Sequence, residues 1–139
     1  MRKTTIGLLV VLCLCGATSW QSQPQWTVVT ERQTVGGTMP FSRTPIFTPR
    51  SAGLYRLSAY CLASGPAGQS GWAFTLIWTD LAGVSDSAAV GCVAGAPSPL
   101  QSNVTILTLQ AGAPVLLSGN ASGDMSSTYD AAFTIEQIQ

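Results

Sequence analysis

The chain contains no histidine, and charged residues make up only 9% of its 139 positions. The lack of imidazole excludes Ser-His-Asp and Cys-His catalytic groups, the usual zinc ligand sets and the commonest general base near neutral pH. Six basic and six acidic residues cancel, which argues against a nucleic-acid partner because no positive surface can hold a phosphate backbone. We therefore expect no cofactor, and an enzyme of this sequence would have to work with carboxylates alone.

The first 19 residues have the three-part layout of a secretory signal peptide: basic residues, an apolar run over residues 6–15, then small residues. We place cleavage after Ser19, with Ala17 as the alternative. An uncleaved anchor is disfavoured because the run is shorter than the roughly 20 residues of a membrane span. A lipid on Cys13 or Cys15 is disfavoured because leucine precedes both. The expected product is secreted or periplasmic, with no membrane contact after signal removal.

A strand, a tight turn and a longer strand are predicted over residues 44–64. Pro49 and Gly53 bracket the turn, where fixed and permissive backbone angles suit a chain reversal. After the turn the side chains alternate in the period of a half-buried strand. The inward set is Tyr55, Leu57, Ala59 and Cys61. Such a face requires a second sheet to cover it.

Further strands are predicted over residues 72–80, 84–93, 103–109, 115–118 and 128–138, and the first two of these should form a hairpin. In the strand predicted over residues 72–80 the inward residues are Trp72, Phe74, Leu76 and Trp78. In the strand predicted over residues 128–138 they are Tyr129, Ala131, Phe133 and Ile135. Residues 20–43 are predicted as a lead-in, with a short strand at 26–32 and a Gly/Pro-containing loop at 33–43. About seven to nine short strands indicate an all-β, antiparallel sandwich or barrel over residues 44–139.

Signal removal leaves two cysteines, Cys61 and Cys92, each on the inward side of its strand. In an oxidising compartment they can form a disulfide that closes a loop of about 31 residues and stabilises the fold by roughly 3 to 4 kcal/mol. The alternative is a pair of buried thiols that act as small apolar groups.

The acidic residues offer two candidate sites. Asp80 and Asp86 flank the predicted hairpin turn, and two converging carboxylates are what a glycosidase needs; solvated turn residues are the favoured interpretation. Asp124 and Asp130 border the last loop, but no calcium-ligand pattern is present. We therefore expect no catalytic residue and no metal site, and we predict that the protein is not an enzyme.

Aromatic residues outside the predicted core are candidates for stacking on sugar rings. They are Trp20, Trp26 and Tyr60. A tryptophan in a β-protein lies more often in a core or an interface than on a sugar platform, so carbohydrate binding is the second hypothesis for function.

Three segments together resemble the jelly-roll superfamily of tumour necrosis factor and the globular heads of complement component C-one-q. Residues 47–57, with Gly53, Leu54 and Tyr55, are similar to its apolar-turn-Gly-x-Tyr strand. Residues 107–115 are similar to its Leu-x-Leu-x-x-Gly-Asp-x-Val turn, with Ala113 where the family has Asp. Tyr129, followed by Phe133 and Ile135, is similar to its closing strand. The layout also resembles uncharacterised exported bacterial or phage-associated β-sandwich proteins.

The resemblance covers residues 44–138 and implies a two-sheet jelly roll that tends to form homotrimers through one sheet. The outward apolar residues Tyr60, Ile77 and Leu116 are the predicted oligomer contacts. We therefore expect a secreted, non-enzymatic structural or ligand-binding module that acts as an oligomer. The alternative is a carbohydrate-binding or adhesin-type surface module, and a glycan or a protein is the expected ligand.

Overall fold

The computed structural model describes residues 25–68, 70–96 and 100–138. Eight β-strands and no helix are present in these ranges. The strands are β1 (Trp26–Gly37), β2 (Phe41–Phe47), β3 (Gly53–Ser64), β4 (Ser70–Thr79), β5 (Ser85–Val93), β6 (Leu100–Leu109), β7 (Val115–Gly123) and β8 (Thr128–Ile138). A search of the same ranges finds no helix with the length and apolar character of a membrane span. The predicted signal peptide lies outside the described residues.

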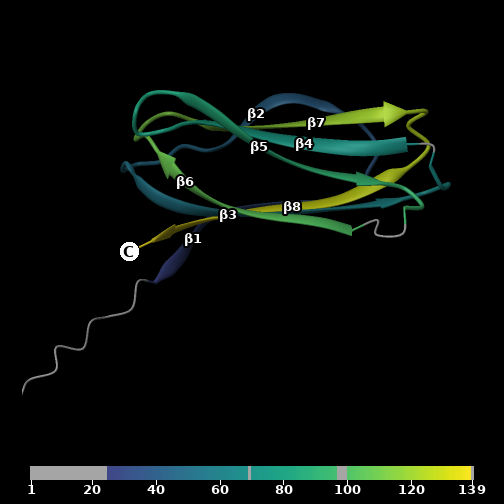
Figure 1. Ribbon diagram of the computed structural model, residues 1–139, viewed down its shortest axis with the longest axis horizontal. Helices are drawn as coiled ribbons and strands as arrows, with labels where there is room; N and C mark the ends of the chain where they lie inside the picture. The colour runs from purple at the N-terminus through teal and green to yellow at the C-terminus, as the bar shows by residue number, and fades with distance from the viewer. Residues whose placement is uncertain (1–24, 69, 97–99, 139) are drawn as a thin grey trace, which may run out of the picture.

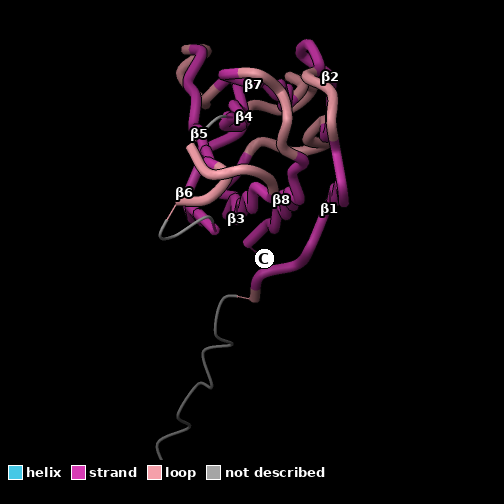
Figure 2. Tube along the Cα trace, turned by 90° about the vertical axis from the view of Figure 1, so that its right-hand side faces the viewer, coloured by secondary structure: helices cyan, strands magenta, loops and turns pink. Residues whose placement is uncertain are grey.

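The strands form two antiparallel sheets of four strands that pack face to face (Figures 1 and 2). Sheet A has the order β1-β8-β3-β6, and sheet B has the order β2-β7-β4-β5. The first strand pairs with the last, β2 with β7, β3 with β6 and β4 with β5. One long antiparallel hairpin rolled into two layers gives this pairing, which is the jelly-roll arrangement. The predicted all-β sandwich is confirmed.

The core lies between the two sheets. It consists of the inward-pointing residues of strands whose sequences alternate between inward and outward positions. The predicted inward residues of β3, β4 and β8 are all buried. Aromatic rings fill the middle: Phe74 packs edge-on against Tyr129 and Phe133, with ring centroids 4.9 and 5.7 Å apart, and Trp72 lies 4.5 Å from Tyr129. Rings of this size dominate the apolar surface that folding removes from water.

The N-terminal part of the domain differs from the prediction. Residues 33–43 are not a loop: β1 is twelve residues long, ends at Gly37, and pairs with β8, and β2 begins at Phe41. The sandwich therefore begins at Trp26, and residues 26–43 are part of it rather than a lead-in. Gly36 and Gly37, the last two residues of β1, form an irregularity in the β1–β8 ladder. Gly36 has a positive φ of 63°, its N–H donates to Asp130 Oδ1, and a side chain on Gly37 would overlap the Tyr129 ring.

The predicted disulfide joins Cys61 of β3 to Cys92 of β5, with the two Cα atoms 5.7 Å apart. Since β3 belongs to sheet A and β5 to sheet B, the bond ties the two layers together through the core. Both cysteines are buried, so the inward positions assigned from the sequence are correct.

Candidate functional site

Exposed aliphatic side chains gather on the outer surface of sheet A. Five large aliphatic residues on this surface are exposed, and we call them the apolar face: Val28, Leu54, Leu100, Val104 and Ile106. Glu31, Gln33 and Ser102 are exposed on the same surface. The partly exposed Trp26, Tyr60 and Leu62 lie on the same surface. The outer surface of sheet B is different, because its exposed and half-exposed positions on β4 and β5 are chiefly Ser, Thr and Ala.

Strand register shows which residues lie beside these aliphatic side chains. Val104 lies opposite Ser58 and Ile106 lies opposite Arg56 across the β3–β6 pair, and Val28 lies opposite Glu136 across the β1–β8 pair. Residues that face each other on neighbouring strands have Cβ atoms about 5 Å apart. Val104 and Ile106 therefore form one apolar patch on β6, and the Arg56–Glu136 pair lies between Ile106 and Val28.

A shallow depression of about 330 Å³ lies in the middle of this surface. Its lining includes the small residues Ser58, Ala132 and Thr134, the larger Tyr60 and Val104, and the acidic Glu31. Val104 is 64% exposed, so it projects from the same surface that contains the hollow. A surface with both a projection and a hollow can pack against a second copy of itself.

One charge pair crosses the apolar face. Arg56 Nε donates to Glu136 Oε2 at 2.6 Å, and the guanidinium lies 5.1 Å from the centre of the Trp26 ring. The hydrogen bond from Arg56 lowers the pKa of the Glu136 carboxyl, and the same bond raises the pKa of Arg56. The two charges neutralise each other, so the pair adds no net charge to this surface.

The residues predicted as oligomer contacts do not lie on one surface. Tyr60 is on the outer side of sheet A, whereas Ile77 and Leu116 are neighbours on the outer side of sheet B, where they pair across β4 and β7. All three are partly exposed. The thickness of the sandwich separates Tyr60 from the other two, so a single flat contact cannot use all three.

Two of the three sugar-stacking candidates share a surface. Trp26 pairs with Ile138, and Tyr60 pairs with Ala132, so the two aromatic residues are separated by six residues along β8, or about 20 Å. The Trp26 ring already contacts Arg56. Trp20 lies outside the described residues.

The acidic candidates have structural contacts of their own. Asp80 Oδ1 accepts hydrogen bonds from the backbone N–H groups of Ala82 and Val84, and so closes the β4–β5 turn. Asp86 accepts from the N–H of Ser87. Among the described residues no three His, Cys, Asp or Glu side chains come together as metal ligands would.

The last loop is also held together by its own carboxylate. Asp124 Oδ1 accepts from both the N–H and the hydroxyl of Ser126, and these bonds lower its pKa. Asp130, the other predicted candidate, instead accepts from Gly36 in β1. The two carboxylates therefore stabilise different parts of the fold.

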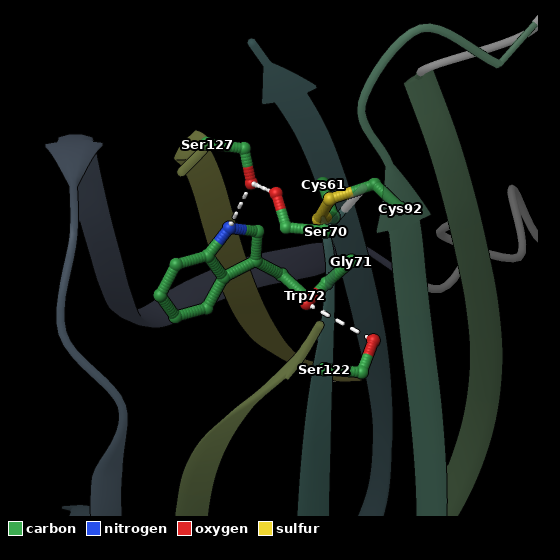
Figure 3. Close-up of a disulfide and its surroundings, with 7 residues drawn as sticks. All are labelled: Cys61, Ser70, Gly71, Trp72, Cys92, Ser122 and Ser127. Atoms are coloured by element: carbon green, nitrogen blue, oxygen red, sulfur yellow. Dashed lines mark hydrogen bonds between the residues drawn. A yellow bond between two sulfur atoms is a disulfide. The ribbon is translucent and has the colours of Figure 1, made fainter. Parts of the chain in front are cut away.

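A buried polar cluster lies beside the disulfide (Figure 3). The hydroxyl oxygen of Ser127 accepts hydrogen bonds from Trp72 Nε1, at 2.9 Å, and from the hydroxyl of Ser70. Both serines are at most 3% exposed. With no base among their partners and no access to solvent, they satisfy the indole N–H and do not form a nucleophile site.

Sequence reasoning missed most of the apolar face. The available signal was in β6, where Val104 and Ile106 point outward while Leu107 and Leu109 lie in the core. A strand that is apolar on both sides is typical of a strand covered on both sides. Sheet B covers the inner side of β6, so a partner that covers its outer side has to come from outside the two-sheet domain.

A comparison with models of protein families finds none that matches the chain, and a comparison with curated proteins finds no relative. The resemblance to the tumour necrosis factor superfamily therefore stays a prediction.

Proposed function

We propose that this protein is an exported, non-enzymatic jelly-roll module that assembles with further copies of itself through the apolar face. The observation that carries the proposal is the gathering of exposed aliphatic side chains on one outer surface of the sandwich. Val104, Ile106 and Val28 are each more than half exposed. Exposed apolar patches, such as that of Val104 and Ile106, mark interaction sites in soluble proteins.

The size and charge of the surface suit a second copy of the same chain. A four-stranded sheet about ten residues long covers roughly 600 Å², which approaches the about 800 Å² that each partner buries in a standard interface. The Arg56–Glu136 pair is neutral, and Glu31 adds a single negative charge at the β1 edge of the surface. A surface with few charges that carries both a projection and a hollow is compatible with the self-complementary contact that an isologous dimer requires.

Export is supported by the signal-like N-terminus and by the cross-sheet disulfide. Disulfides persist in oxidising compartments and are rare in the cytosol. A non-enzymatic role is supported by the sequence, which has no histidine, and by the acids Asp80, Asp86 and Asp124, whose carboxylates accept hydrogen bonds from nearby backbone N–H groups.

The test is the solution mass of the processed chain, measured by light scattering after size-exclusion chromatography across the micromolar range. We expect an oligomer, and a trimer is the state that the family resemblance implies. Val104→Lys should shift the mass toward that of a single chain because it would bury an unpaired charge in the contact. Val93→Lys is the matched control, because Val93 is an exposed valine on the outer side of sheet B, and this variant should keep the wild-type mass.

Two results would contradict self-assembly through this surface. One is a wild-type chain that has the mass of a monomer at every concentration. The other is equal dissociation of the Val104→Lys and Val93→Lys variants.

Carbohydrate binding is the second candidate, and the observation that favours it is that Trp26 and Tyr60 share one surface. It predicts that the chain sediments with an insoluble polysaccharide and that Trp26→Ala and Tyr60→Ala each weaken this binding. A panel of polysaccharides that retains no protein would exclude it.

A further inference from the structure

A pocket of about 410 Å³ opens at one end of the sandwich. It is lined by Val29 of β1, Phe47 of β2, Thr48 and Arg50 of the β2–β3 turn, Tyr55 of β3 and Gln137 of β8. The disulfide lies six residues farther along β3, at Cys61, which is about 20 Å away. The pocket volume is within the range of about 300 to 1,000 Å³ that small-molecule sites occupy. We propose that this pocket binds a small carboxylic acid with an apolar body.

The inner wall of the pocket is apolar and held in place. The rings of Phe47 and Tyr55 meet edge to face, with centroids 5.8 Å apart. The hydroxyl of Tyr55 donates to the backbone oxygen of Ser51 at 2.9 Å, which fixes the ring within the pocket wall. A preformed wall of this kind binds an apolar group with little loss of side-chain entropy.

The turn that carries Arg50 is also fixed. Pro49, directly before it, is buried, and its carbonyl oxygen accepts from the N–H of Gly112 at 2.8 Å. Ser51, directly after it, accepts at its backbone oxygen from Tyr55 and at its hydroxyl from Gln137 Nε2. The backbone on both sides of Arg50 is therefore anchored, while its side chain is exposed at the rim of the pocket.

Arg50 differs from two of the other arginines in what its guanidinium contacts. Arg56 pairs with Glu136, and Arg32 lies over the Phe41 ring. Within the described part of the chain, Arg50 has neither an ion pair nor a ring contact of this kind, and no acidic residue lines the pocket. A free guanidinium beside an apolar wall recognises a carboxylate through paired hydrogen bonds.

The geometry places the two halves of such a ligand. Its carboxylate would lie at the rim against Arg50, and its apolar body would lie against the half-buried Phe47 and Val29, with the buried Tyr55 ring supporting Phe47 from behind. The Gln137 amide donates to Ser51, so its oxygen remains as an acceptor for a polar substituent. The pocket is at the end of the sandwich, whereas the apolar face covers the outer side of sheet A, so ligand binding and self-assembly can be tested separately.

The experiment is a titration of the ¹⁵N-labelled processed chain with phenylacetate, followed by amide chemical shifts, with phenylacetamide as the uncharged analogue. For a ligand of about ten non-hydrogen atoms we expect saturable shifts near Thr48, Arg50 and Gln137, with a Kd of about 1 mM. Phenylacetamide should bind at least about tenfold more weakly because it cannot form the charge-assisted pair. Raising the salt concentration should weaken the binding of phenylacetate and leave the binding of phenylacetamide unchanged, because salt screens only the charged pair.

Arg50→Gln should reduce phenylacetate affinity by about tenfold or more, and it should leave the fold intact because the side chain is exposed. Arg43→Gln, which removes an exposed arginine elsewhere on β2, is the matched control and should bind as the wild type does. The proposal is overturned by shifts that do not saturate, by equal affinity for acid and amide, or by unchanged binding in Arg50→Gln.

Discussion

Reduction of the Cys61–Cys92 disulfide should strongly destabilise the fold. The bond joins residues 31 positions apart in sequence, and closing a loop of that length removes unfolded-state entropy worth about 3.7 kcal/mol at 25 °C. Both sulfur atoms lie in the core, with the two residues at most 2% exposed. Reduction therefore leaves the packed volume almost unchanged, and the free thiols remain as small apolar groups. For a domain of this size, the loss corresponds to a fall in Tm of about 10 to 15 °C.

The assay is thermal unfolding, followed by circular dichroism, of oxidised protein and of protein that was unfolded, reduced and refolded under reductant. Mass spectrometry after thiol alkylation confirms that both cysteines are free. The Cys61→Ala/Cys92→Ala variant is the control, since its Tm must not respond to reductant. A fully reduced protein that melts within about 3 °C of the oxidised form would show that the bond adds little, and the loop-entropy reasoning would be wrong.

Three other perturbations have defined outcomes. Gly37→Ala should lower the free energy of unfolding in urea by about 1 to 3 kcal/mol, because its Cβ would overlap the buried Tyr129 ring. Ser127→Ala should cost a similar 1 to 3 kcal/mol, roughly, by leaving the indole N–H of Trp72 without its acceptor. Stability should be flat between about pH 5 and 8, because the chain has no histidine. It should fall as the pH drops below about 4, because the lowered pKa of Glu136 stabilises the fold only while that carboxyl is ionised.

Matched variants separate these effects from general damage. A Cβ on Gly53 meets no atom closer than 3.8 Å, so Gly53→Ala should cost much less than Gly37→Ala, and equal losses would contradict the overlap argument. Ser126→Ala removes only an exposed hydroxyl bond to Asp124 and leaves the bond from the Ser126 N–H in place, so it should have a small effect. A loss as large as that of Ser127→Ala would contradict the buried-acceptor argument. Glu136→Gln should reduce the loss of stability in acid; an unchanged pH profile would assign that loss to other carboxyls.

Several features of the fold were predictable because they depend on local pattern. Alternation along β3, β4 and β8 identified which side chains are buried, since neighbouring residues in a strand point to opposite sides. The same rule placed both cysteines inward. At Gly36 and Gly37 local pattern failed, because glycines that usually mark loops here form an irregularity inside a ladder, where the ring of Tyr129 takes the space of a side chain.

The candidate surface depended on information that alternation does not contain. Outward positions such as Tyr60 and Ile77 could be recognised in the sequence, but each sheet has its own outer side, and strand pairing decides which positions meet. The structure places Tyr60 with Val104 on sheet A, and Ile77 with Leu116 on sheet B.

The sequence by itself determined the fold class, the inward residues of most strands and the absence of imidazole chemistry. Each of these follows from composition or from the two-residue period of an extended backbone. The tertiary structure decided that Cys61 meets Cys92, that the aliphatic side chains of β1, β3 and β6 share the outer side of sheet A, and that Arg50 lines a pocket with Phe47 and Val29. The physical reason is that these contacts join residues from distant strands, and they exist only once the rolled hairpin has set the order of strands in both sheets.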